Sequence, residues 1–128
     1  MKNLFSIAVL LSLTSCSSET VTTRSIKNNS DKNLKMVVYR NGRGSDTLNI
    51  ESGQSNQLSI TTSNKGSDEE PDCVWEIDSA YTEVDGGGIL TKKIQITDNW
   101  DSENEKVKTI PPDYENSCIF NIYNADIE

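Results

Sequence analysis

The chain of 128 residues contains no histidine. Histidine is the usual base of Ser-His-Asp and Cys-His catalytic sites and a common zinc ligand, so its absence excludes these sites. Basic side chains are also scarce, because 12 Lys and Arg stand against 20 Asp and Glu, which gives a net charge of −8. Nucleic acids and anionic lipid surfaces both attract basic patches. The composition therefore argues against either as an electrostatic partner.

A hydrophobic run long enough to cross a membrane is missing from the N-terminal region. Residues 4–13 form an apolar stretch of ten residues behind Lys2, whereas a transmembrane helix needs about twenty. A basic residue followed by a short apolar run is typical of a secretory signal peptide. We therefore expect export.

The apolar stretch ends in Leu13, Thr14, Ser15 and Cys16. An aliphatic residue, two small residues and a cysteine resemble the lipobox of bacterial lipoproteins. The resemblance implies cleavage before Cys16, attachment of lipid to this cysteine and anchoring in the bilayer. Ser17 does not resemble the inner-membrane retention signal, so the expected location is the outer membrane, facing the periplasm or the cell surface. An ordinary secretory peptide is the alternative.

The predicted cleavage divides the chain into three parts. Residues 1–15 are the signal peptide, residues 16–20 are the lipidated cysteine and a short tether, and residues 21–128 are one domain. Because Lys2 leaves with the peptide, the net charge changes from −8 to −9. The short tether predicts a domain that sits close to the bilayer.

Two cysteines remain after Cys16 is assigned to lipid. In an exported domain, Cys73 and Cys118 most simply form one disulfide. Two buried free thiols are the first alternative. A metal pair is the second, and it would need carboxylates to complete the ligand set because the chain has no histidine.

Short apolar alternations separated by turn residues run along the whole domain. They predict strands at residues 21–27, 34–40, 47–51, 58–62, 73–81, 89–98, 106–110 and 118–124. Trp75 alternates with Cys73 and Ile77 and is expected in the core. No window shows a helical period. About eight strands with frequent turns predict an all-β, immunoglobulin-like antiparallel β-sandwich of about 7–8 strands, with a small closed β-barrel as the alternative.

The polar segment at residues 99–105 contains a tryptophan. Trp100 stands between Asn99 and Asp101, and an exposed indole beside polar side chains is a common sugar-binding arrangement. We therefore predict a ligand site at these three residues. The alternative is that Trp100 folds back and caps an open core.

Two acidic runs are candidate calcium sites, because Ca²⁺ binds several carboxylate oxygens. The first comprises Asp68, Glu69, Glu70 and Asp72, and the second comprises Asp101, Glu103 and Glu105. Neither matches the EF-hand loop. Solvated acidic loops are the alternative for both.

Two short segments resemble the Asp-Ser/Thr-aliphatic O-glycosylation signal of some Gram-negative anaerobes. The resemblance implies modification at Thr47, which follows Asp46, and at Ser79, which follows Asp78. Thr47 stands at the start of an expected strand, which suits exposure better than the position of Ser79.

The sequence contains no Gly-x-Ser-x-Gly or Ser-x-x-Lys motif. We therefore predict a membrane-anchored, non-enzymatic binding or structural lipoprotein of the Gram-negative cell envelope, without a cofactor. The alternatives are a glycan- or surface-protein-binding accessory of nutrient uptake and an inhibitor of an attacking enzyme such as lysozyme. The expected partners are the bilayer, through Cys16, and an envelope protein or glycan.

Overall fold

The computed structural model describes residues 18–128. The predicted signal peptide and the lipidation site Cys16 lie outside the described residues. Within residues 18–128 the regular elements are strands and two short 3-10 turns. This part of the chain contains no helix that is long and apolar enough to cross a membrane. The all-β prediction is confirmed.

Seven strands make up the described domain, at the lower end of the predicted number. They are β1 (Thr20–Asn28), β2 (Leu34–Arg40), β3 (Gly44–Ile50), β4 (Ser55–Ser63), β5 (Ile77–Val84), β6 (Asp101–Thr109) and β7 (Pro112–Ile122). The 3-10 turns are η1 (Thr97–Asn99) and η2 (Asn124–Asp126).

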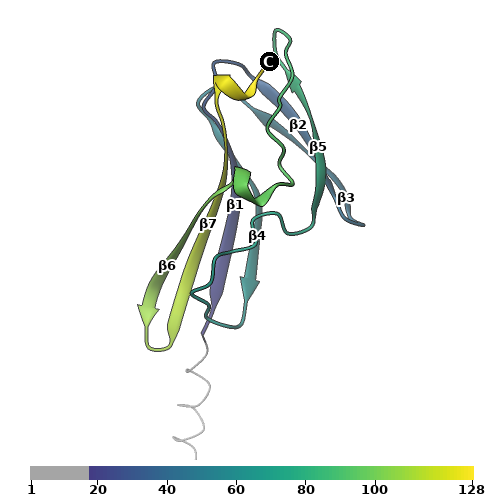
Figure 1. Cartoon of the computed structure of the whole chain (residues 1–128). Helices are drawn as coiled ribbons and strands as arrows, with labels where there is room; N and C mark the ends of the chain where they lie inside the picture. The colour runs from purple at the N-terminus through teal and green to yellow at the C-terminus, as the bar shows by residue number, and fades with distance from the viewer. Residues whose placement is uncertain (1–17) are drawn as a thin grey trace, which may run out of the picture.

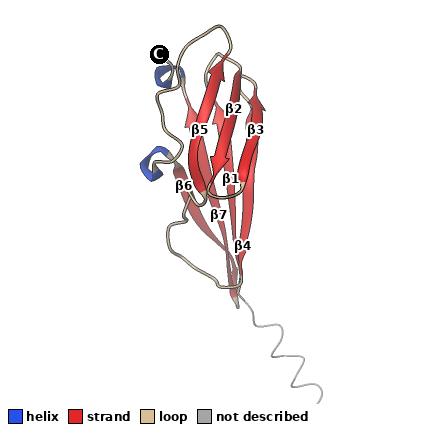
Figure 2. Ribbon diagram, turned by 90° about the vertical axis from the view of Figure 1, so that its right-hand side faces the viewer, coloured by secondary structure: helices blue, strands red, loops and turns tan. Residues whose placement is uncertain are grey.

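The strands form two sheets that face each other (Figure 1, Figure 2). One has four strands in the order β4-β1-β7-β6, and the other has three in the order β3-β2-β5. The sheets do not close into a barrel, so the barrel alternative is wrong. The antiparallel prediction fails at one ladder, because β1 and β7 run parallel. Apolar alternation determines which face a residue occupies and not the direction of the neighbouring strand, so the pattern could not reveal this pairing.

The three-stranded sheet covers only one half of the four-stranded sheet (Figure 1). The other half is covered by the connection between β4 and β5, which we call the β4–β5 connection (residues 64–76). This connection is held by polar contacts, since Thr20 Oγ1 donates to the carbonyl of Lys65 at 2.6 Å and Asn104 Nδ2 donates to the carbonyl of Ser67 at 3.1 Å. Gly66 is required there, because a Cβ atom would lie 2.5 Å from the carbonyl oxygen of Pro112.

The apolar core lies between the sheets in the half that both of them cover. Its buried members include Ile26, Leu34, Met36, Val38, Ile50, Phe120 and Ile122. These side chains alternate along their strands, as the period of two requires. The prediction that Trp75 belongs to this core is wrong, because 39% of its surface is exposed. It lies in the β4–β5 connection before β5 begins, so strand alternation does not apply to it.

The expected strand at residues 89–98 is absent. Instead of pairing with a sheet, this segment bonds to the C-terminal tail, where Ile89 and Glu128 exchange backbone hydrogen bonds of 2.7 and 2.8 Å. Ile94 is still buried whereas Ile96 is 44% exposed. The expected polar loop at residues 99–105 largely forms the first half of β6. Its alternating carboxylates belong to the solvent-facing side of a strand, which sequence polarity alone cannot distinguish from a loop.

The Cys73–Cys118 disulfide is confirmed, with an S–S distance of 2.03 Å and a sequence separation of 45 residues. Cys73 lies in the β4–β5 connection and Cys118 lies in β7. Both cysteines are buried. The bond therefore attaches the β4–β5 connection to the interior of the four-stranded sheet.

Removal of this disulfide should destabilise the domain substantially. For a closed loop of this length, the chain-entropy relation gives about 4 kcal/mol. We expect the double variant Cys73→Ser and Cys118→Ser to lose about this much free energy of unfolding in urea titrations. Wild-type protein unfolded in the presence of a reductant is the matched control and should show a similar loss. An unchanged midpoint in both would contradict the assignment.

Candidate functional site

Trp75 is the large aromatic side chain that the β4–β5 connection presents to solvent. The chain turns directly after it, where the Ile77 amide donates to the Val74 carbonyl at 3.0 Å. Glu76 takes a positive φ of 59° inside this turn. Such a conformation is uncommon for a residue other than glycine and is typical of positions where the surrounding structure imposes it. Here the Glu76 carbonyl accepts a hydrogen bond from the Asn41 amide at 3.0 Å, which ties the turn to the end of β2.

Two guanidinium groups lie over the indole of Trp75. The Cζ atoms of Arg24 and Arg43 are 5.7 and 6.0 Å from the ring centroid. Both distances are within the range of cation–π attraction. Arg43 also forms an ion pair of 3.4 Å with Glu76. Trp75, Arg24 and Arg43 therefore form one cluster, which we call the Trp75 site.

Arg24 is the buried member of the Trp75 site, with only 4% of its surface exposed. Its Nε and Nη2 both donate to the main-chain carbonyl of Asp72, and Nη1 donates to Thr61 Oγ1 at 2.9 Å. Burial lowers the pKa of Arg24, the charge of Asp72 raises it, and Arg40 lowers it. Arginine side chains stay charged in proteins, so Arg24 is a desolvated cation in the site.

A hollow of about 240 Å³ adjoins these side chains. Arg24 and Trp75 line it together with the hydroxyl-bearing residues Thr22, Thr61 and Ser63. The hollow therefore offers a cation, hydroxyl groups and an aromatic surface, which together suit the binding of a polar or anionic ligand.

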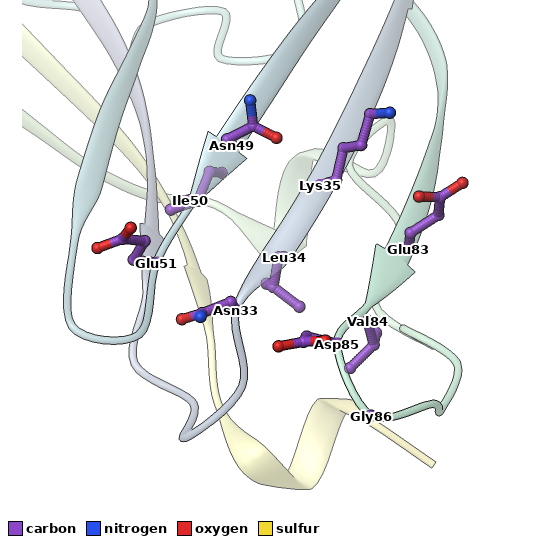
Figure 3. A pocket seen from close by; sticks show the side chains of 10 residues that line it. All are labelled: Asn33, Leu34, Lys35, Asn49, Ile50, Glu51, Glu83, Val84, Asp85 and Gly86. Atoms are coloured by element: carbon purple, nitrogen blue, oxygen red, sulfur yellow. The ribbon is translucent and has the colours of Figure 1, made fainter.

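A second hollow, of about 420 Å³, lies at the end of the three-stranded sheet near the turns (Figure 3). Its lining includes Lys35, Glu51, Glu83 and Asp85. Figure 3 shows Glu51 and Glu83 on opposite sides of β2, so their carboxylates do not converge on one point. Because it has no aromatic surface and no buried charge, this hollow is a weaker candidate than the Trp75 site.

The predicted sugar-binding site at Trp100 is wrong, because it requires that the indole of Trp100 be exposed. Trp100 is only 7% exposed, its Nε1 donates to the Ile94 carbonyl at 2.7 Å, and its ring lies 5.4 Å from that of Phe120. The alternative, that this side chain folds back over the core, is confirmed. Its neighbours make internal contacts, because Asn99 donates to the Lys93 carbonyl and Asp101 accepts from Asn121.

The acidic runs do not converge on a metal site. Across residues 18–128 no group of three or more His, Cys, Asp or Glu side chains is arranged to hold a metal ion. The side chains of Asp68, Glu69, Glu70 and Asp72 are exposed, as are those of Asp101, Glu103 and Glu105. In the β6–β7 ladder, Glu105 stands directly opposite Glu115, so this face of the sheet is acidic.

The two predicted glycosylation sites differ in accessibility. Thr47 is exposed on β3, which is an edge strand, and the preceding Asp46 forms an ion pair of 2.6 Å with Arg40. Ser79 is partly buried in β5, opposite Tyr39. Thr47 is the more accessible acceptor, and modification at either residue stays a prediction.

Compared with known proteins, the chain matches no protein-family model, no curated protein and no solved structure. The sequence reasoning missed Arg24 and assigned Trp75 to the core. One signal was available for Arg24, because it shares the buried phase of β1 with Thr22 and Ile26. A charged residue in that phase indicates a buried cation.

Alanine substitution should distinguish the two tryptophans. Trp100→Ala removes a buried ring and its hydrogen bond, so we expect a loss of about 3–5 kcal/mol in the free energy of unfolding. Trp75→Ala removes a half-exposed ring, and the expected loss is about 1 kcal/mol or less. Urea titration of both variants measures the difference, and equal losses would show that the placements are wrong.

Proposed function

We propose that the chain is a lipid-anchored, non-enzymatic binding protein of the Gram-negative cell envelope, attached to the outer membrane through Cys16. The N-terminal residues support this proposal, because Leu13 to Cys16 resemble a lipobox. A disulfide within the domain is what an oxidising compartment favours. The first strand begins at Thr20, so the proposed anchor and the domain are separated by only a few residues.

The observation that carries the binding role is the Trp75 site. A half-exposed indole and a buried guanidinium meet beside a hollow, and a disulfide two residues from Trp75 holds the segment in place. Aromatic and arginine side chains dominate the energetics of many recognition sites. The expected partner is an envelope glycan or protein. The hydroxyl-rich lining of the hollow favours the glycan, which is consistent with an accessory role in nutrient uptake.

We also place the domain among immunoglobulin-like sandwiches at the level of architecture. Four strands facing three, with an internal disulfide, are the features that support this description. The strand order differs from that of constant-type domains, in which the first, second, fifth and fourth strands share a sheet. Here the first strand pairs with the fourth and the seventh. The likeness is therefore one of layers and not of connectivity.

Inhibition of an attacking enzyme such as lysozyme is the second candidate function. The acidic face formed by Glu103, Glu105 and Glu115 favours it, because these exposed carboxylates lie on adjacent strands. An acidic surface attracts a cationic enzyme and increases its association rate. In this case binding would depend on salt concentration and not on Trp75.

Lipidation is tested by mass spectrometry of protein extracted from membranes. We expect an N-terminal peptide that begins at an acylated Cys16, and we expect Cys16→Ser to leave the membrane fraction. A peptide that begins at Ser17 or Met1 would contradict the anchor. Thr47→Ala, on an edge strand of the domain, is a control that should leave membrane attachment unchanged.

Binding is tested by capture of partners from envelope extract and on a glycan array. We expect Trp75→Ala to lose most of the bound signal, whereas Trp100→Phe, which keeps an aromatic ring in the core, should retain it. Signal that survives Trp75→Ala but vanishes when Glu103 and Glu105 are replaced by Gln would favour the inhibitor candidate instead.

A further inference from the structure

Arg24 is a buried charge that has no direct ion pair within residues 18–128. It lies on β1 in the same phase as the buried Thr20, Thr22 and Ile26. Isolated buried charges are costly unless they are paired or well bonded. The neighbouring arginines have carboxylate partners, because Arg40 pairs with Asp46 and Arg43 pairs with Glu76. Neither of these ion pairs, which are those found within residues 18–128, includes Arg24.

The hydrogen bonds of Arg24 leave part of its guanidinium unused. The group carries five N–H donors. Its bonds to the Asp72 carbonyl use one donor on Nε and one on Nη2, and its bond to Thr61 uses one on Nη1. One N–H therefore remains on each terminal nitrogen without an acceptor among the described residues. Two such donors are what a carboxylate accepts in a bidentate pair.

The surroundings of these donors indicate what else the ligand contains. The hollow beside Arg24 is lined by hydroxyl groups of Thr22, Thr61 and Ser63 and by Trp75. Hydroxyl groups both donate and accept hydrogen bonds, which suits the hydroxyls of a sugar ring, and the indole suits its apolar C–H surface. At about 240 Å³ the hollow is smaller than the roughly 300–1,000 Å³ of most small-molecule pockets. It therefore has room for one sugar ring, and the other rings of an oligosaccharide would lie outside it.

We propose that the Trp75 site binds an acidic sugar, whose carboxylate accepts hydrogen bonds from Arg24 while its ring lies against Trp75. This inference rests on the proposed binding function and adds the class of ligand. The ligand supplies the directly bonded carboxylate that Arg24 lacks within residues 18–128. A protein chain with a free carboxylate is the competing source of that charge, and it is disfavoured because the lining is rich in hydroxyl groups.

The test uses the mature lipoprotein in detergent, with tetragalacturonate as the acidic probe and its fully methyl-esterified form as the neutral one. The chain contains two tryptophans, so the two indole N–H signals in an NMR spectrum are assigned by the Trp75→Phe variant. We expect tetragalacturonate to shift the Trp75 signal and leave the buried Trp100 signal in place. The ester should bind at least ten-fold more weakly in calorimetric titration.

Substitutions at Arg24 show whether this guanidinium is the receptor. Arg24→Lys keeps the charge but loses the paired donors, and Arg24→Met keeps much of the side-chain length but loses the charge. We expect both to weaken tetragalacturonate binding at least ten-fold. Lys27→Met, an exposed position on the same strand, is the matched control and should bind as the wild type does. If either Arg24 variant does not fold, the acid-to-ester ratio of the wild type decides the question.

Several outcomes would overturn the inference while leaving the proposed function intact. Equal binding of acid and ester would show that the site does not recognise the charge of the ligand. Full binding by folded Arg24 variants would show that another residue binds the carboxylate. If neither sugar binds, the ligand is not an acidic sugar. The same conclusion follows if only a peptide with a free C-terminal carboxylate shifts the Trp75 signal. The proposed function fails on separate grounds. It fails if Cys16 carries no lipid, or if the protein captures its partners from envelope extract equally well without Trp75.

Discussion

The Cys73–Cys118 disulfide holds the β4–β5 connection against the middle of the four-stranded sheet, and the Trp75 site depends on this attachment. Cys118 stands opposite Arg24 in the parallel β1–β7 ladder. The residue before Cys73 supplies the carbonyl that Arg24 binds, and Trp75 follows two residues after the cysteine. One covalent bond therefore fixes Arg24, its main-chain acceptor and the exposed ring together. Without this bond, ordering the same groups would cost more conformational entropy.

The interior is divided into two chemically different halves. Under the three-stranded sheet it is mainly apolar, with Asn28 and Ser30 as buried polar residues near the turns. Under the β4–β5 connection it is a network of hydroxyl and amide groups. Asn116 illustrates the second half, because it donates to Thr22 Oγ1 at 3.2 Å and accepts from Asn104. A network of this kind contributes little hydrophobic stabilisation, but it is specific, because each unmade bond would leave a buried polar group. The disulfide lies where the two halves meet, because both cysteines belong to the buried apolar cluster and Cys118 is two residues from both Asn116 and Phe120.

The sequence predicts those features that depend on neighbouring residues and misses those that depend on tertiary contacts. The strand at residues 34–40 was predicted with its observed bounds, because apolar residues alternate within it and turn residues flank it. The sequence predicts a buried Trp75 and an exposed Trp100, and the structure shows the reverse. Both residues lie just before a strand begins, so the alternation of the strand does not determine which way their side chains point. Glu76 has a left-handed backbone conformation that cannot be predicted from its residue type. The Trp75 site combines β1, the turn between β2 and β3, and the β4–β5 connection, so only the tertiary structure could assemble it.

The position of β1 has a mechanical consequence for a domain that is held at its N-terminus. This strand is the first after the proposed anchor, and it is bonded on both sides, to β4 and to β7. Pulling on the tether loads both ladders along their length, so that many hydrogen bonds resist in shear at once instead of opening one after another. An edge strand in the same place would resist through the hydrogen bonds of one ladder only. If Cys16 is the anchor as proposed, the strand that first bears the load is one that both of its neighbours hold.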